Sequence, residues 1–111
     1  MASIKNIYVD AGSTYSNIIT VTSSSGAPLN LAGYTVASQM RKSYQTSTAY
    51  AFTASIYSAD TGKIRLQLTD EESEAIPAGR YLYDVEIQDS NGARTRVVEG
   101  IVTVNPQITK V

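Results

Sequence analysis

Apolar and polar residues alternate along most of the chain, and this period of two predicts β-strands. The cleanest alternation lies at Ile64, Leu66 and Leu68, which are separated by charged and polar residues. Because successive side chains of a strand point to opposite faces, this run predicts a strand with one buried and one solvated face. The same pattern predicts seven strands, over residues 4–9, 15–22, 34–42, 50–56, 63–68, 78–89 and 94–104.

A long β-hairpin over Ala78–Val104 is the central prediction from this pattern. The dipeptide Asn91-Gly92 lies between its arms and supplies the positive backbone φ that a tight turn requires. The second arm is rich in Val and Ile, which fit a pleated sheet. In the first arm, four apolar residues share one face: Tyr81, Tyr83, Val85 and Ile87.

Two registers of this hairpin stay open at the sequence level. A two-residue turn at Asn91-Gly92 places Tyr83 opposite Gly100, where the absent side chain leaves room for the ring. The same turn places Asp84 opposite Glu99, which is an unfavourable pair of like charges.

A three-residue loop with Gly92 in the left-handed conformation shifts the pairing by one residue. It sets Glu86 opposite Arg96, which is a favourable pair. In both registers the last strand is apolar on both faces, because it contains the adjacent pairs Val97-Val98 and Ile101-Val102. A strand with one face in water should not have this pattern.

We therefore expect the outer side of the hairpin to be covered, either by a local loop or the tail over residues 105–111, or by another chain. The last strand is also expected to be a sheet edge, which invites pairing with another chain. The candidate interface consists of Leu82, Val97, Val98, Ile101 and Val102.

A single helical turn is expected at Asp70–Ala75, before the sixth strand. Thr69 and Glu72 have the spacing of a capping box, and Pro77 ends the helix. The turn leads to Gly79 and Tyr81, and this arrangement resembles the corner of immunoglobulin-like domains, where a tyrosine hydroxyl bonds back to the backbone. Thr69, Glu72, Gly79 and Tyr81 thus form a predicted structural corner, with a plain core aromatic as the alternative for Tyr81.

The predicted fold class is all-β, an immunoglobulin-like β-sandwich of about seven antiparallel strands with one short helical turn before the sixth strand. A length of 111 residues is typical of one domain. We expect the domain to cover residues 1–106 and residues 107–111 to form a C-terminal tail.

The amino-acid composition excludes several kinds of functional site. The chain contains neither Cys nor His, which excludes disulfides, thiolate metal sites and a histidine general base. The net charge of −1 gives no basic footprint for nucleic acid or a membrane surface. The N-terminus lacks the apolar region of a signal peptide, and no apolar run has membrane-spanning length. We expect a soluble protein made in a cytoplasm.

Two acidic groups are candidates for further chemistry. The carboxylates of 70–74 follow a helical turn, whereas calcium requires oxygen ligands at alternating loop positions, so a solvated corner is the preferred interpretation. Asp84 and Glu86 lie on a strand face, and glycoside hydrolysis requires a carboxylate pair in a cleft. The sequence therefore predicts no enzyme, no catalytic residues, no metal and no cofactor.

Several stretches of the sequence resemble small tailed-phage virion proteins. They are similar to the N-terminal domain of phage baseplate upper proteins, over residues 9–106. The resemblance implies a non-enzymatic structural component of a bacteriophage virion, in the baseplate, tail, neck or head decoration. It also implies multiple symmetric copies that pack against other virion proteins, with no nucleic-acid or membrane partner. The stretches are Gly33–Thr35, Ser38–Tyr44, Ala75–Val85 and Arg96–Val104.

A carbohydrate- or receptor-binding module at the particle surface is the alternative function. Tyr44, Tyr50 and Tyr57 lie near a loop rich in Ser and Thr, and such residues suit adaptable recognition surfaces. Glycan binding requires exposed aromatic residues that converge at one end of the domain. Assembly requires instead an extended apolar sheet face, so the positions of these side chains distinguish the two functions.

Overall fold

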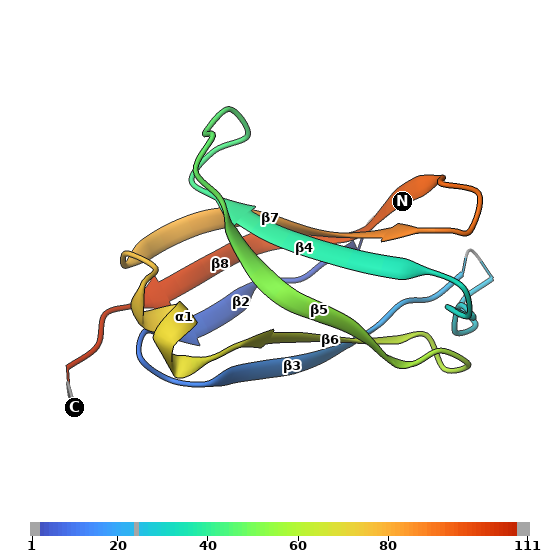
Figure 1. The fold of residues 1–111 in the computed structure, drawn as a ribbon, viewed down its shortest axis with the longest axis horizontal. Helices are drawn as coiled ribbons and strands as arrows, with labels where there is room; N and C mark the ends of the chain where they lie inside the picture. Colours follow the sequence, from blue (N-terminus) through green and yellow to red (C-terminus); the bar gives the residue numbers. More distant parts are fainter. Residues whose placement is uncertain (1–2, 24, 109–111) are drawn as a thin grey trace.

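The computed structural model describes residues 3–23 and 25–108, which form a curled all-β sheet with one short helix (Figure 1). The expected tail over 107–111 is described only as far as Ile108. The elements, in chain order, are β1 (Ser3–Ile4), β2 (Ile7–Asp10), β3 (Tyr15–Thr20), β4 (Thr35–Arg41), β5 (Tyr50–Ser58), β6 (Lys63–Leu68), α1 (Asp70–Glu74), β7 (Gly79–Gln88) and β8 (Arg94–Asn105).

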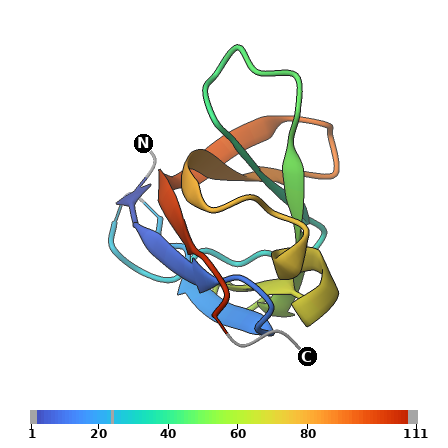
Figure 2. The same ribbon diagram turned by 90° about the vertical axis from the view of Figure 1, so that its left-hand side faces the viewer.

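Hydrogen bonds link the strands in the order β1-β8-β7-β4-β5-β6-β3, and β2 also pairs with β8. The sheet curls because β5 belongs to both of its halves. Residues 50–52 of β5 pair with β4, whereas residues 53–58 pair with β6. Figure 2 shows the curled sheet from one end, with the halves on either side of the core.

The N-terminal strands run parallel to β8, so the expectation of a purely antiparallel sheet is wrong. Ser3 lies opposite Val98 in β1, and Ile7 lies opposite Val102 in β2. β8 is therefore flanked on both sides, by β7 and by β1 and β2, and it is not the sheet edge that the sequence predicts. The predicted first strand is split at the polar pair Lys5-Asn6.

An extra residue in β8 combines the two registers that the sequence left open. Asp84 lies opposite Glu99, as a two-residue turn requires, whereas Glu86 lies opposite Arg96, as a three-residue loop requires. The pairing shifts between them because Val97 is an additional residue on β8, which forms a β-bulge. Both predicted pairings are thus present, on opposite sides of the bulge.

The hairpin closes through the three-residue loop. The backbone N–H of Asp89 donates to the carbonyl of Ala93 at 3.0 Å, which leaves residues 90–92 as the loop. Gly92 has a φ of +89°, a conformation that glycine adopts without a steric cost. The Asp89 side chain accepts hydrogen bonds from the backbone N–H groups of Asn91 and Ala93, both at 2.9 Å.

The core forms where the apolar faces of the two halves meet. The predicted inward residues of β6 and of the first hairpin arm are all buried. Leu31, in the connection before β4, is also fully buried and donates its N–H to the carbonyl of Ala59. The buried residues of these segments are Leu31, Ile64, Leu66, Leu68, Tyr81, Tyr83, Val85 and Ile87.

The predicted capping box and corner are confirmed. The Thr69 hydroxyl accepts from the N–H of Glu72 at 3.1 Å, and the Glu72 carboxylate accepts from the N–H of Thr69 at 2.8 Å. The Tyr81 hydroxyl donates to the carbonyl of Pro77 at 2.5 Å. Burial of this ring raises the pKa of the Tyr81 hydroxyl above its ordinary value, so the proton stays in the corner bond.

Ser73 ties α1 to the loop before β3. Its side chain is fully buried, and its hydroxyl donates to the carbonyl of Ser13 at 2.8 Å and accepts from the N–H of Gly12 at 3.0 Å. A buried hydroxyl whose donor and acceptor are both hydrogen-bonded stabilises the fold, whereas a buried hydroxyl without partners would destabilise it. The short helix is therefore fixed to the body of the domain at one point.

Leu66→Ala is expected to destabilise the domain by about 2–5 kcal/mol, because truncation of a buried leucine loses packing and leaves a cavity. The measurement is urea unfolding followed by circular dichroism. Gln67→Ala, on the outward face of the same strand, is the matched control and should change the unfolding free energy by less than about 0.5 kcal/mol. Equal midpoints for the two variants would contradict the position of Leu66 in the core.

Tyr81→Phe is expected to cost on the order of 1 kcal/mol, because the ring still packs while the bond to Pro77 is lost. Unfolding curves of the wild type and the variant measure this difference. Tyr44→Phe, in an exposed loop, is the control and should leave the curve unchanged. A curve of Tyr81→Phe that superposes on the wild type would show that the corner bond adds nothing to stability.

Candidate docking groove

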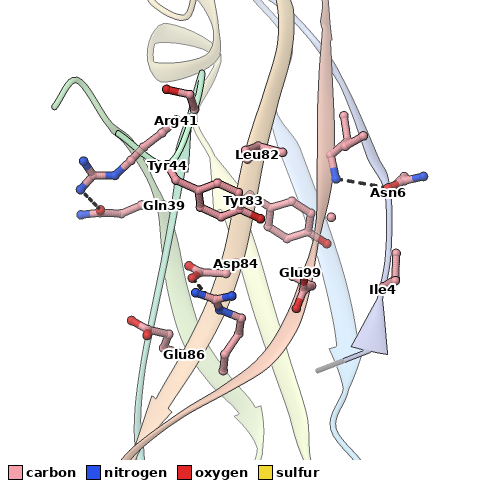
Figure 3. A pocket seen from close by; sticks show the side chains of 14 residues that line it. Ile4, Asn6, Gln39, Arg41, Tyr44, Leu82, Tyr83, Asp84, Glu86 and Glu99 are labelled. Atoms are coloured by element: carbon pink, nitrogen blue, oxygen red, sulfur yellow. Dashed lines mark hydrogen bonds and ion pairs between the residues drawn. The ribbon is translucent and has the colours of Figure 1, made fainter. Parts of the chain in front are cut away.

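The outer face of β4, β7 and β8 is hollowed into a groove of about 560 Å³ (Figure 3). The registers of the three strands arrange its floor in three rows. One row holds the apolar pair Leu82 and Ile101 next to Arg41, and the other two rows carry the remaining charges. From β4 to β8 the rows are Arg41, Leu82 and Ile101, then Gln39, Asp84 and Glu99, then Ala37, Glu86 and Arg96.

Apolar side chains stand at the rim as well as on the floor. Ile4 of β1 and Tyr44 of the loop between β4 and β5 line the groove and are 79% and 76% exposed. Figure 3 places them on either side of β8. Leu82 is half-buried on the floor, and Ile101 beside it is 38% exposed. The groove thus combines four accessible apolar side chains from four separate segments.

Arg41 holds the loop that carries Tyr44. Its guanidinium donates from Nη1 to the carbonyl of Thr46 at 2.7 Å and from Nη2 to Oε1 of Gln39 at 3.2 Å. Ser43 and Thr46 also share a hydrogen bond between their hydroxyls at 2.7 Å. These contacts fix the base of the loop, so the position of Tyr44 at the rim is determined by strand β4.

The bulge at Val97 brings a cation to the acidic row. Arg96 Nε lies 3.1 Å from Oδ2 of Asp84, which itself lies opposite Glu99. The guanidinium therefore offsets the repulsion between these two carboxylates. Both partners are partly exposed, so the ion pair contributes only about 0–1 kcal/mol to stability and remains open to exchange with a binding partner.

Tyr83 anchors the N-terminal strand beneath the groove. Its hydroxyl donates to the carbonyl of Lys5 at 2.5 Å. A Cβ atom at Gly100 would collide with this same carbonyl, so Gly100 makes room for the backbone of Lys5 and not for the Tyr83 ring as the sequence suggested. Burial, and to a smaller extent the neighbouring Tyr15, raises the pKa of the Tyr83 hydroxyl far above its ordinary value.

The candidate interface residues divide between the core and the groove. Val98 and Val102 are 2% and 0% exposed and point into the core, so they are not available to a partner. Val97, the bulged residue, is half-buried and packs against the core. Leu82 and Ile101 line the groove. Ile4 also reaches this surface, although its sequence pattern does not place it there, because only the parallel pairing of β1 with β8 brings it next to the groove.

The three tyrosines of the alternative function do not converge. Tyr44 lies in the loop before β5, whereas Tyr57 lies near the other end of that strand. Tyr50 packs its ring edge-on against Tyr81, with the centroids 5.9 Å apart. The guanidinium of Arg65 covers the Tyr57 ring at 4.6 Å. These positions do not provide a shared aromatic platform for a sugar ring.

Two further features concern ligands and membranes. Within residues 3–23 and 25–108, no group of three or more acidic side chains lies together in a way that could hold a metal ion. In the same part of the chain, no helix has the length and apolar character needed to cross a membrane. In the acidic segment before β7, Glu72 is used by the capping box.

Comparisons with known proteins show a likeness of fold alone. No protein-family model matches the chain, and no curated protein matches its sequence. A mutant of the SrpA adhesin from Streptococcus sanguinis is 13% identical, with a TM-score of 0.51, over 96% of this chain and 56% of that one. An internalin-like protein of Listeria monocytogenes is 15% identical, with a TM-score of 0.49, over 94% of this chain and 28% of that one. This chain therefore spans only part of each protein.

The raised pKa of Tyr83 predicts a loss of stability in alkali. Well below pH 10 the hydroxyl keeps its proton in both the folded and the unfolded state. Above pH 10 the unfolded chain releases the proton while the folded chain retains it, so the unfolding free energy falls by up to about 1.4 kcal/mol per pH unit for this group. Urea unfolding between pH 8 and about pH 11 measures the slope.

Tyr83→Phe should reduce this alkaline slope, because the group that titrates is gone. Tyr57→Phe, which also removes one tyrosine hydroxyl but from an exposed ring, is the matched control. If Tyr83→Phe and the wild type lose stability equally above pH 10, the Tyr83 hydroxyl does not keep its proton in the folded state.

Proposed function

We propose that the chain is a non-enzymatic structural module of a tailed-phage particle, and that it works by packing against neighbouring virion proteins in repeated copies. The sequence stretches that resemble phage virion proteins support the phage context. The groove on the outer face of β4, β7 and β8 supports the packing role. A position in the baseplate, tail, neck or head decoration is consistent with both.

The single observation that carries the packing role is the apolar content of the groove. Exposed apolar side chains that gather in one hollow point to a contact site more than apolar side chains scattered singly over a surface do. Here Ile4 and Tyr44 are largely exposed and line the same groove as Leu82 and Ile101. Burying these side chains against another protein would remove them from water and stabilise the assembly by the hydrophobic effect.

The charges in the groove suit a protein partner with its own mixture of charges. Three carboxylates, from Asp84, Glu86 and Glu99, line the groove together with Arg41 and Arg96. Charged groups around an apolar contact contribute to register and partner choice more than to affinity. The Arg96–Asp84 pair would be the first to exchange partners, since it is partly exposed.

An immunoglobulin-like fold is the finer structural part of the proposal. In one half of the curled sheet, β4, β7 and β8 are neighbours, as strands C, F and G are in immunoglobulin domains. In the other half, β3, β6 and β5 are neighbours, as strands B, E and D are. The bond from Tyr81 to Pro77 is the counterpart of the tyrosine corner. The continuous pairing through β5 departs from that pattern.

The test begins with particles made from a genome that encodes this chain. Mass spectrometry of the purified particles should detect the wild-type chain. Ile101→Glu is expected to fold, because this side chain is 38% exposed. It should be depleted at least about tenfold from the particles, because a carboxylate then replaces an apolar side chain that the partner would bury. Circular dichroism of the isolated variant checks the fold.

Ser55→Glu is the matched control, since it adds the same charge to an exposed position of β5 outside the groove. It should enter particles like the wild type. Absence of the wild-type chain from the particles would contradict the phage role. Normal incorporation of folded Ile101→Glu would contradict the groove as docking surface, and glycan binding by that variant would favour a surface recognition module.

A further inference from the structure

We propose that β3 is a second contact site, at which another copy of this chain adds its own β3 in antiparallel orientation about a two-fold axis at Ile18. This strand lies at one end of the hydrogen-bonded order of the sheet and pairs, within the described residues, only with β6. It belongs to the half of the sheet opposite the groove, so the two contacts do not compete.

The free hydrogen-bonding groups of β3 follow from its register. The N–H of Val21 donates to the carbonyl of Gly62 at 2.7 Å, in line with the pairing of β3 and β6. In an antiparallel ladder, bonded pairs alternate along the strand. The odd-numbered residues of β3 therefore bond to β6, and the even-numbered residues turn their N–H and C=O groups away from the sheet. These outward residues are Ser16, Ile18 and Thr20.

The edge lacks the features that usually prevent pairing. Natural edges are protected by charged residues, proline, bulges or very short strands. β3 has six residues, Tyr15–Thr20, with no charge, no proline and no glycine, and its pairing with β6 has no bulge. By contrast, β1 and β2 at the other end have two and four residues. Among the described strands, β3 is thus the long edge open to addition.

A second copy is the occupant that this edge fits best. Because β3 carries no charge, two copies do not repel each other. An axis at Ile18 pairs this residue with itself and pairs Ser16 with Thr20 in both directions, so every outward N–H and C=O finds a partner. Hydroxyl pairs of this kind across strands are favourable. The two Ile18 side chains, each 39% exposed, also meet at the axis.

The contact is isologous, so each copy offers the same surface to the other. Six residues bury less area than stable dimers require, and we therefore expect a weak, concentration-dependent dimer in solution. In an array of many copies, other contacts raise the local concentration of the edges and the same pairing becomes effective. The two-fold contact and the groove would then use opposite halves of the domain.

Disulfide cross-linking tests both the contact and its register, since the chain has no Cys of its own. Ile18→Cys places two thiols across the axis with Cα atoms about 5.5 Å apart, within disulfide reach. Ser16→Cys is the matched control. In the proposed register the two introduced residues lie about 14 Å apart along the direction of the paired β3 strands, which is too far for a disulfide. Mild oxidation at high concentration should give a covalent dimer with Ile18→Cys and mostly monomer with Ser16→Cys.

Analytical ultracentrifugation provides a second measurement without an introduced thiol. Ile18→Lys places two like charges at the axis and should weaken self-association at least about tenfold. Thr53→Lys, exposed on β5 in the same half of the sheet, should associate like the wild type. Circular dichroism checks that both variants fold.

Several outcomes would overturn the proposal. One is a wild-type protein that remains monomeric at about millimolar concentration. Another is an Ile18→Lys variant that associates like the wild type. A third is disulfide cross-linking of both Cys variants, or of neither. If β3 variants impair particle assembly while the wild type shows no self-association, the strand added at this edge belongs to a different protein.

Discussion

The extra residue at Val97 is the constraint on which the rest of the structure depends. After the bulge in the chain, Val98 and Val102 face inward and close the core against the first hairpin arm. Before it, the pairing is shifted by one residue, and Arg96 reaches Asp84. Without the bulge, one of these two arrangements would be lost, because a slip of one residue reverses which side chains face the core. The bulge thus allows a packed interior and a partly neutralised outer face in one strand.

The N-terminal strand depends on this arrangement and completes it. Gly100 leaves room for the carbonyl of Lys5, and the Tyr83 hydroxyl binds that carbonyl from below. Between β1 and β2, where the pairing with β8 is interrupted, Oδ1 of Asn6 accepts from the N–H of Ile101 at 3.2 Å. The contacts join residues far apart in the sequence. They cover the edge of β8, which would otherwise expose unpaired backbone groups.

The sequence predicted the features that arise from local chemistry. The strands, the capping box at Thr69 and the corner bond of Tyr81 all depend on residues within a few positions of one another. It did not predict the parallel pairing of β1 and β2, since the apolar pattern of 4–9 does not specify a partner strand or a direction. For the same reason the apolar pair Val97-Val98 suggested a strand that is apolar on both faces, whereas the physical cause is a bulge that inserts Val97 as an additional residue packed against the core.

The groove and the free edge of β3 differ in what they can recognise. The groove offers side chains, so its selectivity depends on the shape and charge around Leu82 and Ile101. The edge offers mainly backbone groups, which any extended strand can match, so its selectivity depends on the absence of charge and on the fit at Ile18. A module that must repeat in a symmetric array benefits from this division. The less selective contact can join identical copies, while the more selective one distinguishes the neighbour.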